Sequence, residues 1–485
     1  MSSQDALWLT MDRPNNLMVI DSLMWFNAPL DLDRVREVLM ARFVTKFPVF
    51  SCRPVHAGNH WEWQQDPDFD LDFHVREIAL PGDAGFSELQ AWVGSERSVP
   101  FDRNRPLWTF SVVTNFRPDP LTLGSAVMIR SHHSVADGVR LTQVMVSLCD
   151  VEGEPTDVGK ALRNSTTPID VAVSAATKLA ASTVDVVSTS TRTAASLLVN
   201  PMKAMTAAAG VADHAGAILR NPARATDVVE LVSSPDNRPV NDVASTAKLL
   251  LAAPSVETVW SGPPQPAKGA SWAPMLSLAE VKRIRRATGT TVNDVLLGVV
   301  AGALSRYLAA HGEDTVDEVM WMVPVSVTPF DPDAGGHLGN HFALVAFRMP
   351  LGITDVHERL NEIHTRMDRI KASDEPLITF GVQTLISRLP APAAASLTNY
   401  FANKARGVLT NVPGPTGPIS FADVTVAGLL GWAPCSGDQA MTICIFSYNG
   451  QVSVGFGTDA TLIPDPSLLT DFFYEEFEAM SAAFA

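Results

Sequence analysis

Charged residues are scarce in this chain of 485 residues, and positively charged ones most of all. Only 18% of the residues are charged, where an average soluble protein has roughly 25%. The 36 Lys and Arg against 52 Asp and Glu leave a net charge of −16. Because nucleic-acid binding needs a basic surface that neutralises phosphates, this balance argues against nucleic acid as a partner.

Cysteine is also rare. The four cysteines lie far apart and form no Cys-x-x-Cys pair: Cys52, Cys149, Cys435 and Cys444. This spacing fits neither a disulfide framework nor a zinc ribbon, and it is typical of the reducing cytosol. The first residues show no signal peptide, and the apolar run at residues 295–305 is shorter than the about 20 residues that span a bilayer. We therefore expect a cytoplasmic protein without a transmembrane helix.

Apolar residues, in contrast, are plentiful. They make up 46% of the chain, and the mean hydropathy is +0.11. Such a composition excludes a disordered chain, because enough apolar surface is available to offset the entropy of ordering. At about 150 residues per domain, the length allows two or three domains. We expect two.

The composition changes along the chain and predicts where these domains lie. Residues 1–151 and 243–485 both mix helical and strand patterns, which indicates two domains of the α/β (α+β) class. Between them, residues 152–242 are rich in Ala, Ser, Thr and Val, and we interpret them as a helical linker. This linker is either a connector packed along the body or an amphipathic surface lying on lipid, and its lack of Trp and Phe favours the connector.

Hydrophobic periodicity predicts individual elements in both halves. We expect helices over 31–43, 138–148, 278–288 and from 291 to about 308, strands over 121–130, 320–327 and 341–349, and a hairpin of strands 441–448 and 451–456. The Asn-Gly pair at 449–450 is the hairpin turn.

The sharpest local signal is the heptapeptide HHSVADG at 132–138, between a predicted strand and a predicted helix. Neighbouring strand residues point to opposite faces, so His132 and His133 cannot easily share a metal, and no clear third ligand accompanies His133 and Asp137. A histidine with a pKa near the working pH suits a general base. Asp137 would accept backbone hydrogen bonds or pair with a cation, and Gly138 would allow close approach or an unusual backbone angle.

The heptapeptide resembles the HHxxxDG signature of the CoA-dependent acyltransferase superfamily, which includes chloramphenicol acetyltransferase-like enzymes and condensation domains. Companion motifs in the same order resemble those of the bacterial wax ester synthase/diacylglycerol acyltransferase family: Pro106-Leu107-Trp108, Asn293-Asp294, VPVS at 323–326, Gly339-Asn340 and NVPGP at 411–415. The segments DALWLTMDRPNNLM at 5–18 and SYNG at 447–450, with Asp459, extend the resemblance over nearly the whole chain.

The resemblance implies two chloramphenicol acetyltransferase-like domains joined by the linker, with an active-site tunnel at their interface. It also implies transfer of a long-chain acyl group from acyl-CoA to diacylglycerol or a fatty alcohol. His133 would be the general base, while His132, Asp137 and Gly138 would support it. Acyl-CoA is a co-substrate, and neither a cofactor nor a metal is expected. The lipophilic substrates suggest peripheral contact with a membrane or lipid-droplet surface.

Five residues outside the heptapeptide are candidates for substrate binding, each with a structural alternative. Pro106, Leu107 and Trp108 would line the acyl or acceptor channel, whereas a tryptophan of the ordinary core gives the same pattern. Asn293 and Asp294 would shape the site across the domain interface, whereas a polar first helical turn is favoured by the helix dipole alone.

One departure from the family pattern concerns the partner of Asp137. The family often has an arginine within two residues of VPVS, but here residues 327–329 read Val-Thr-Pro. Asp137 would then pair with another cation or only with backbone groups. The departure keeps two alternatives open: an acyltransferase for another hydroxylated lipid, and a catalytically weak protein that binds lipid or coats lipid droplets.

Overall fold

A computed structural model describes residues 1–58, 60–151, 254–326, 338–340, 342–371 and 391–485, together with five positions between 379 and 389. The predicted linker at 152–242 lies outside these described residues, as do residues 327–329 after VPVS. Both interpretations of the linker therefore stay predictions.

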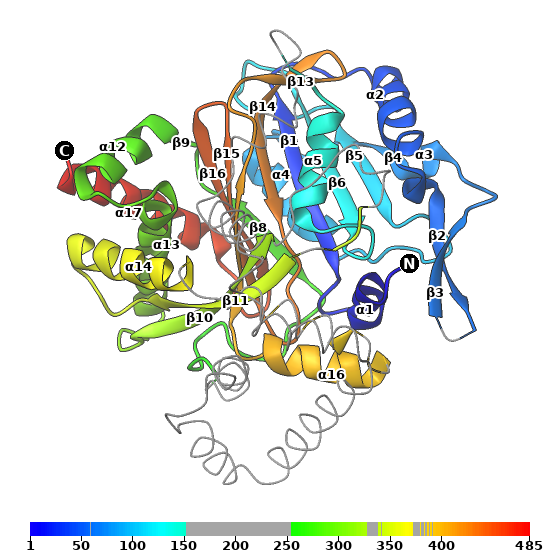
Figure 1. Ribbon diagram of the computed structural model, residues 1–485. Helices are drawn as coiled ribbons and strands as arrows, with labels where there is room; N and C mark the ends of the chain where they lie inside the picture. Colours follow the sequence, from blue (N-terminus) through cyan, green and yellow to red (C-terminus); the bar gives the residue numbers. More distant parts are fainter. Residues whose placement is uncertain are drawn as a thin grey trace, which may run out of the picture.

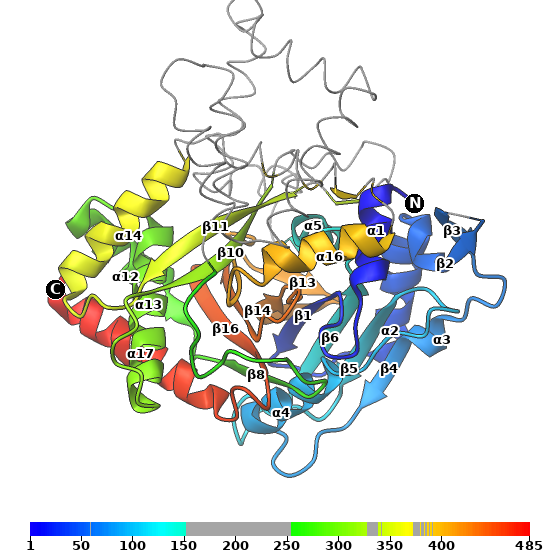
Figure 2. The ribbon, with the colours of Figure 1, turned by 90° about the horizontal axis from the view of Figure 1, so that it is seen from below.

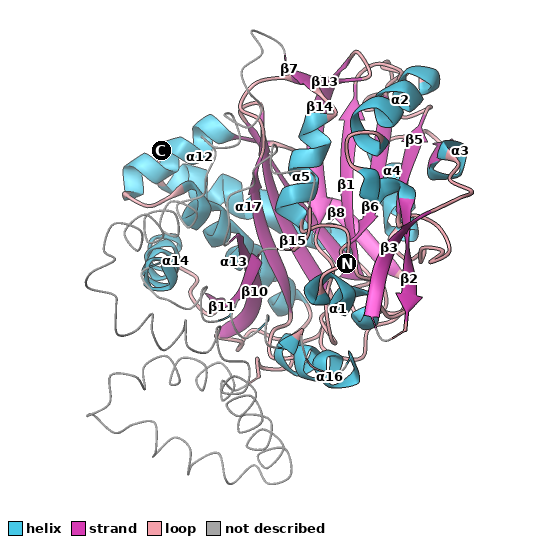
Figure 3. Cartoon of the chain, turned by 45° about the vertical axis from the view of Figure 1, so that its right-hand side comes forward, coloured by secondary structure: helices cyan, strands magenta, loops and turns pink. Residues whose placement is uncertain are grey.

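Two large sheets form the body of the protein (Figures 1 and 3). The first, seven-stranded in the described part of the chain, has the order β4 (Val75–Ile78), β5 (Trp108–Val113), β6 (Ser125–His132), β1 (Val19–Phe26), β14 (Val424–Trp432), β13 (Ile419–Phe421), β7 (Asp150–Val151). The second has the order β11 (Phe342–Pro350), β10 (Glu318–Ser326), β12 (Gly407–Pro413), β15 (Met441–Tyr448), β16 (Gln451–Asp459), β8 (Lys268–Trp272), and β9 (Leu276–Ser277) also pairs with β16. A separate hairpin joins β2 (Cys52–Ala57) to β3 (His60–Gln65).

Helices cover both sheets. In the first half these are α1 (Ser3–Met11), α2 (Leu32–Val38), a π-helical turn (Leu39–Val44), a 3₁₀ turn (Pro48–Ser51), α3 (Leu71–His74), α4 (Phe86–Glu96) and α5 (Gly138–Ser147). In the second half they are α12 (Leu278–Thr288), α13 (Val292–Ala310), α14 (Val356–Lys371), α16 (Ala391–Ala402) and α17 (Pro466–Ala483). Figure 2 shows α12, α13, α14 and α17 gathered on one side of the second sheet, and α16 beside α1.

The two halves of the chain share the first sheet. Strand β14 pairs antiparallel with β1 from Asp21↔Trp432 to Phe26↔Val426, and β13 continues the sheet outward. Two strands from the second half of the sequence therefore complete the sheet of the first half. The predicted class, α/β with two sheet-containing units, is confirmed. The exact domain limits of 1–151 and 243–485 stay predictions.

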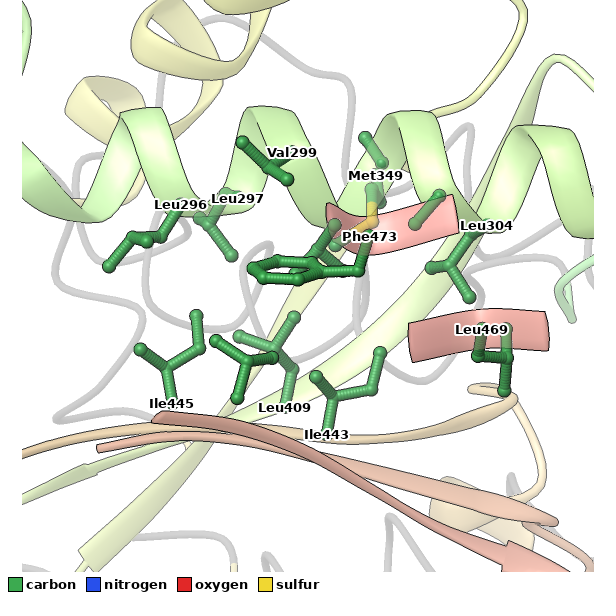
Figure 4. Close-up of a cluster of buried hydrophobic side chains, with 14 of the residues drawn as sticks. Leu296, Leu297, Val299, Leu304, Met349, Leu409, Ile443, Ile445, Leu469 and Phe473 are labelled. Atoms are coloured by element: carbon green, nitrogen blue, oxygen red, sulfur yellow. The ribbon is translucent and has the colours of Figure 1, made fainter. Parts of the chain in front are cut away.

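The second sheet and its helices enclose the larger apolar core. Helix α13 lies against the sheet and contributes Leu296, Leu297 and Leu304 to a cluster that also contains Ile443 of β15 and Phe473 of α17 (Figure 4). In the described part of the chain, α13 is the one helix with the length and apolar composition to cross a membrane, and 72% of its most apolar window is buried. Its burial is that of a core helix.

Most predicted elements agree with the structure. Asp31 caps α2 by accepting from two backbone N–H groups, and Thr291 caps α13 in a capping box. The hairpin turn at 449–450 has φ of 45° and 75° at its two residues, the left-handed values that favour an Asn-Gly pair. The strand expected over 121–130 and on into His132 is β6, which ends at His132 but begins only at Ser125. Asp119 accepts from the N–H groups of Leu121 and Thr122 and holds a turn before it.

Candidate active site

His133 continues strand β6 by one residue. Its N–H donates to Met18 O (2.7 Å), one step beyond the β1–β6 ladder, where Val19 pairs with His132. Because side chains alternate along a strand, Ser131 and His133 belong to one face of the sheet, and Arg130 and His132 to the other.

The imidazole of His133 is enclosed by aromatic rings from both halves of the chain. Trp8 of α1 lies 4.2 Å away between ring centroids, and Phe342 of β11 lies 5.5 Å away. His133 is 6% exposed, and its Nδ1 has no hydrogen-bond partner in the described part of the protein. Ring packing and the backbone therefore hold this imidazole at the junction of the two halves.

Burial also sets the charge of His133. Removal from water disfavours the imidazolium, which outweighs the attraction of Asp137 and lowers the pKa of His133 to about 4. The ring is therefore neutral at physiological pH and has a lone pair available to take a proton, as a general base requires.

Gly339-Asn340, from the second half, holds the backbone of the heptapeptide. Asn340 Nδ2 donates to His133 O (2.9 Å) and to Asp5 Oδ1 of α1 (2.8 Å). Gly339 exchanges two backbone hydrogen bonds with the loop, donating to Val135 O and accepting from Asp137 N–H. Its φ of 62° is in the left-handed region, where a side chain would be strained.

His132 belongs to a separate, polar group. Its Nδ1 accepts from Ser134 N–H (3.1 Å), so the ring proton is placed on Nε2, which lies 3.8 Å from Asp12 Oδ2. Burial lowers the pKa of His132. Burial acts to raise the pKa of Asp12, but contacts with His132 and hydrogen bonds from Met18 N–H and Arg103 outweigh it and lower that pKa. His132 thus supports the loop from the opposite side of the strand.

Asp137 pairs with a cation, Arg140, which is one of the two alternatives that the sequence predicted for it. It caps α5 by accepting from Arg140 N–H (2.9 Å), and its other oxygen lies 2.5 Å from Arg140 Nη1. Both side chains are buried. The cation therefore comes from the first turn of the helix itself.

Of the two alternatives expected for Gly138, the unusual backbone angle is not observed. Its φ is not in the left-handed region, and a Cβ added there would meet none of the described residues within 4 Å. Gly138 is the first residue of α5, where ordinary helical angles suffice. The open space in front of it is compatible with the other expectation, close approach of a substrate.

The structure places Pro106, Leu107 and Trp108 in the core beside β6. Leu107 O accepts from His132 N–H (2.9 Å), which ties this segment to the heptapeptide. Trp108 donates its ring N–H to Phe50 O (2.7 Å) and stacks on His74 with 4.3 Å between centroids. These are the contacts of a core tryptophan, and a role in substrate binding stays a prediction.

Asn293 and Asp294 lie in the first turn of α13. Asn293 Oδ1 accepts from Asn411 Nδ2 (2.9 Å), which joins the Asn-Asp pair to the NVPGP segment. Asp294 is fully buried; its Oδ2 accepts from Thr291 N–H (2.9 Å) and lies 2.7 Å from His364 Nδ1. The fold thus brings the Asn-Asp pair and the NVPGP segment together. The contacts of this group do not include His133 in the described part of the protein.

Four residues that matter for the site were not assigned a role by the sequence. Arg140 follows Asp137 by three positions, the spacing of a helical ion pair, so its partnership was open to prediction. Trp8, Asn340 and His364 come from distant segments, and no local pattern reveals their partners. In the described part of the chain, no group of three His, Cys, Asp or Glu converges as a metal site would require.

Comparison with known proteins agrees with this geometry. The model of the wax ester synthase/diacylglycerol acyltransferase catalytic domain matches residues 1–296, and that of the WS/DGAT C-terminal domain matches residues 338–481. A Mycobacterium tuberculosis protein named as a diacylglycerol O-acyltransferase is 26% identical over 99% of this chain and 89% of its own length. The O-acyltransferase WSD of Acinetobacter baylyi is 23% identical over 99% of this chain and 96% of its own.

Solved structures show the same fold. The wax ester synthase/diacylglycerol acyltransferase of Marinobacter aquaeolei superposes with a TM-score of 0.65 at 18% identity, covering 100% of this chain and 99% of that one. The first condensation domain of the calcium-dependent antibiotic synthetase gives a TM-score of 0.55 at 15% identity, covering 100% and 95%. The two family models together cover most of the chain, which therefore belongs to the wax ester synthase/diacylglycerol acyltransferase family of O-acyltransferases.

Proposed function

We propose that this enzyme moves a long-chain acyl group from acyl-CoA to the hydroxyl of diacylglycerol or a fatty alcohol, with His133 as the general base. The observation that carries the proposal is the neutral, buried imidazole of His133 at the junction of the two halves. Trp8 and Phe342 fix the ring, and Asn340 fixes the backbone that carries it.

The reaction follows from what a neutral imidazole can do. His133 takes the proton of the acceptor hydroxyl while that oxygen attacks the thioester carbonyl carbon. The tetrahedral intermediate collapses, the carbon–sulfur bond breaks, and the CoA thiolate leaves with the proton that His133 returns. The product is an ester, and no acyl-enzyme forms. Acyl-CoA enters as a co-substrate, and neither a metal nor a further cofactor has a role.

Arg140 weakens the alternative of a catalytically weak lipid-binding protein. That alternative rested on the arginine missing after VPVS, which would leave Asp137 without its family partner. In the structure Arg140 supplies a guanidinium to Asp137 from α5. Asp137 therefore has a cationic partner without that arginine, which supports an active enzyme over the alternative.

The substrates also suggest where the enzyme works. Diacylglycerol and fatty alcohols reside in membranes and lipid droplets, so we place the enzyme in the cytoplasm with peripheral contact to such surfaces. The unpaired state of all four cysteines is compatible with a reducing compartment. Co-flotation of the protein with phosphatidylcholine vesicles containing dioleoylglycerol tests the contact, and protein that stays at the bottom of the gradient contradicts it.

Removal of the imidazole tests the chemistry. The purified protein is incubated with radiolabelled palmitoyl-CoA and either dioleoylglycerol or hexadecanol, and ester formation and CoA release are measured. We expect His133→Ala to lower kcat by about 10²- to 10⁴-fold, the usual contribution of a general base. His60→Ala, at an exposed histidine, is the matched control and should leave kcat unchanged.

Each outcome is decisive. If folded His133→Ala keeps near-full activity, the mechanism is wrong. Turnover only with other hydroxylated lipids would change the acceptor, and binding of palmitoyl-CoA without CoA release from the wild-type protein would overturn acyl transfer.

A further inference from the structure

Asp12 is the residue at which helix α1 ends, next to the start of β1 (Figure 1). Its side chain is 14% exposed, and its two carboxylate oxygens have different partners. Oδ1 accepts from Met18 N–H (2.8 Å), while Oδ2 lies 3.1 Å from Arg103 Nη2 and 3.8 Å from His132 Nε2. One carboxylate therefore joins the end of α1 to three segments: the residue before β1, the segment before β5, and the last residue of β6.

The first of these contacts leads to the backbone of His133. Met18 donates its N–H to Asp12, and its carbonyl oxygen accepts from His133 N–H (2.7 Å). The side chain of Met18 is buried in one apolar cluster with Trp8 and Phe342, the two rings that flank the imidazole. A shift of Met18 would therefore move both the main chain and the surroundings of His133.

Helix α1 is the second connection, because the carbonyl oxygens of a last helical turn need partners. Asp12 N–H donates to Trp8 O (3.2 Å). Arg103, whose guanidinium contacts the same carboxylate, donates to Leu9 O (2.8 Å). The ring N–H of Trp8 has no hydrogen-bond partner in the described part of the protein, so the helix and apolar packing set the place of this ring beside His133.

His132 is the third connection. It ends β6, directly before His133, and is 2% exposed. Asp12 faces it as an ion, because burial, which raises the pKa of Asp12, is outweighed by contacts with His132 and Arg103 that lower it. The negative charge attracts the ring proton on Nε2 and holds His132 on the face of the strand opposite His133.

We propose that Asp12 is a positioning residue for acyl transfer, which holds His133 in place through the three groups described above. The inference rests on the proposed role of His133 as general base. Each group touches this histidine in its own way: Met18 by a backbone hydrogen bond, Trp8 by ring packing, and His132 by the peptide bond. Because a misplacement of about 1 Å can slow catalysis about 100-fold, loss of the carboxylate should affect the reaction more than substrate binding.

Replacement of the carboxylate tests the role. Asp12→Ala removes both the acceptor for Met18 N–H and the negative charge, whereas Asp12→Asn keeps an acceptor oxygen and removes only the charge. With palmitoyl-CoA and hexadecanol we expect Asp12→Ala to lower kcat about 100-fold and Asp12→Asn about tenfold, with KM within about twofold of wild type. Asp31→Ala is the matched control, because Asp31 also accepts from backbone N–H groups at a helix end, that of α2. It should lose stability and keep the wild-type kcat.

A measurement without turnover reports on His133 directly. Diethyl pyrocarbonate modifies accessible, neutral imidazoles, and mass spectrometry of peptides gives the rate at each histidine. His133 is 6% exposed beside Trp8 and should react slowly in wild type. In Asp12→Ala its rate should rise about tenfold or more, the effect of a local opening made easier by roughly 1.4 kcal/mol. The exposed His60 is the internal reference and should react equally in both proteins.

The two measurements separate this inference from the proposed function. Wild-type kcat and unchanged modification of His133 in folded Asp12→Ala overturn the positioning role, whatever the activity of His133→Ala. A higher KM at unchanged kcat overturns it as well, because Asp12 would then serve substrate binding. Faster modification of His133 in Asp12→Ala, combined with full activity of His133→Ala, overturns the general base, while the hold of Asp12 on this histidine stands.

Discussion

The side-chain amide of Asn340 donates a hydrogen bond to the main-chain oxygen of His133 over 2.9 Å, across a separation of 207 residues. The same amide reaches Asp5, so three distant segments meet at His133, the proposed general base. The second half of the chain thus positions the histidine that the first half supplies. Asn340 is in this sense a positioning residue.

Replacement of Asn340 by Ala should lower both activity and stability. Two buried acceptors lose their donor, which costs about 1–3 kcal/mol in the free energy of unfolding. We expect kcat to fall about 10- to 100-fold with little change in KM, because a displaced base slows proton transfer more than binding. Urea unfolding and steady-state kinetics measure the two effects. Asn403→Ala, which removes a contact with Asp438 at the surface, is the control, and wild-type kcat in folded Asn340→Ala would contradict the positioning role.

Arg140→Met should destabilise the protein strongly. It removes the guanidinium from the buried carboxylate of Asp137, and loss of one partner of a buried ion pair typically costs about 3–5 kcal/mol. Arg140→Lys keeps a cation and should lose less. Arg34→Met, which breaks an exposed ion pair with Asp423, is the control and should leave the unfolding midpoint close to that of wild type. Equal unfolding midpoints for Arg140→Met and wild type would show that the pair contributes no stability.

The pH dependence of kcat/KM should lack the acid limb of an ordinary histidine. Burial lowers the pKa of His133 to about 4, so the ring stays neutral well below the usual histidine value near 6.5. We expect kcat/KM to be flat from pH 7 down through 6 and to fall only as pH 4 is approached. An inflection near pH 6.5 in protein shown to be folded by circular dichroism would contradict this.

The same shift predicts how stability depends on pH. The pKa of His133 is lower in the folded than in the unfolded chain, so below pH 6.5 the unfolded state binds more protons. The contribution of His133 is therefore fully present above pH 6.5 and is lost as the pH falls toward 4. His133→Ala should lessen the loss of urea stability between pH 7 and pH 5, and an identical loss in both proteins would contradict the shift.

The sequence allowed prediction of local structure and of the central histidine because both depend on short-range patterns. Helix α12 is observed over the predicted residues, Leu278–Thr288, and Thr291 is the predicted cap of α13. The heptapeptide and the order of its companion motifs identified the family, while the catalytic role of His133 stays a prediction. In contrast, the turn before β6 depends on Asp119, whose side chain competes with strand pairing.

Long-range contacts were beyond prediction. The pairing of β14 with β1 brings residues 424–432 into the first sheet, and nothing in either strand specifies its partner. The contact of Trp8 with His133 likewise depends on the docking of α1, which only the assembled fold defines. The partner of Asp137, in contrast, could have been predicted from the sequence, because Arg140 lies three residues away and helical spacing alone points to it.

Asp294→Ala should reduce stability without impairing chemistry in the folded enzyme. Asp294 accepts from Thr291 N–H at the start of α13 and contacts His364, so its loss removes a helix cap and a buried hydrogen bond. We expect a cost of about 2–4 kcal/mol in unfolding and a kcat within a few fold of wild type. Asp368→Ala, which removes the exposed carboxylate near His364, is the control. A raised KM at unchanged stability would instead support substrate binding by Asp294.

Gly138→Ala should leave the fold intact and impair substrate binding. Gly138 lies in helix α5 without a left-handed φ, and no described residue comes within 4 Å of the position of an added Cβ. Alanine is favoured over glycine in a helix by about 0.5–1 kcal/mol, so the melting temperature should hold or rise. If the thioester passes through this space toward His133, the added methyl group raises KM for acyl-CoA, and we expect an increase of about tenfold or more, the effect of roughly 1.4 kcal/mol. Gly417→Ala is the matched control, because a Cβ there also meets none of the described residues within 4 Å. An unchanged KM in Gly138→Ala would show that the substrate takes another path to the histidine.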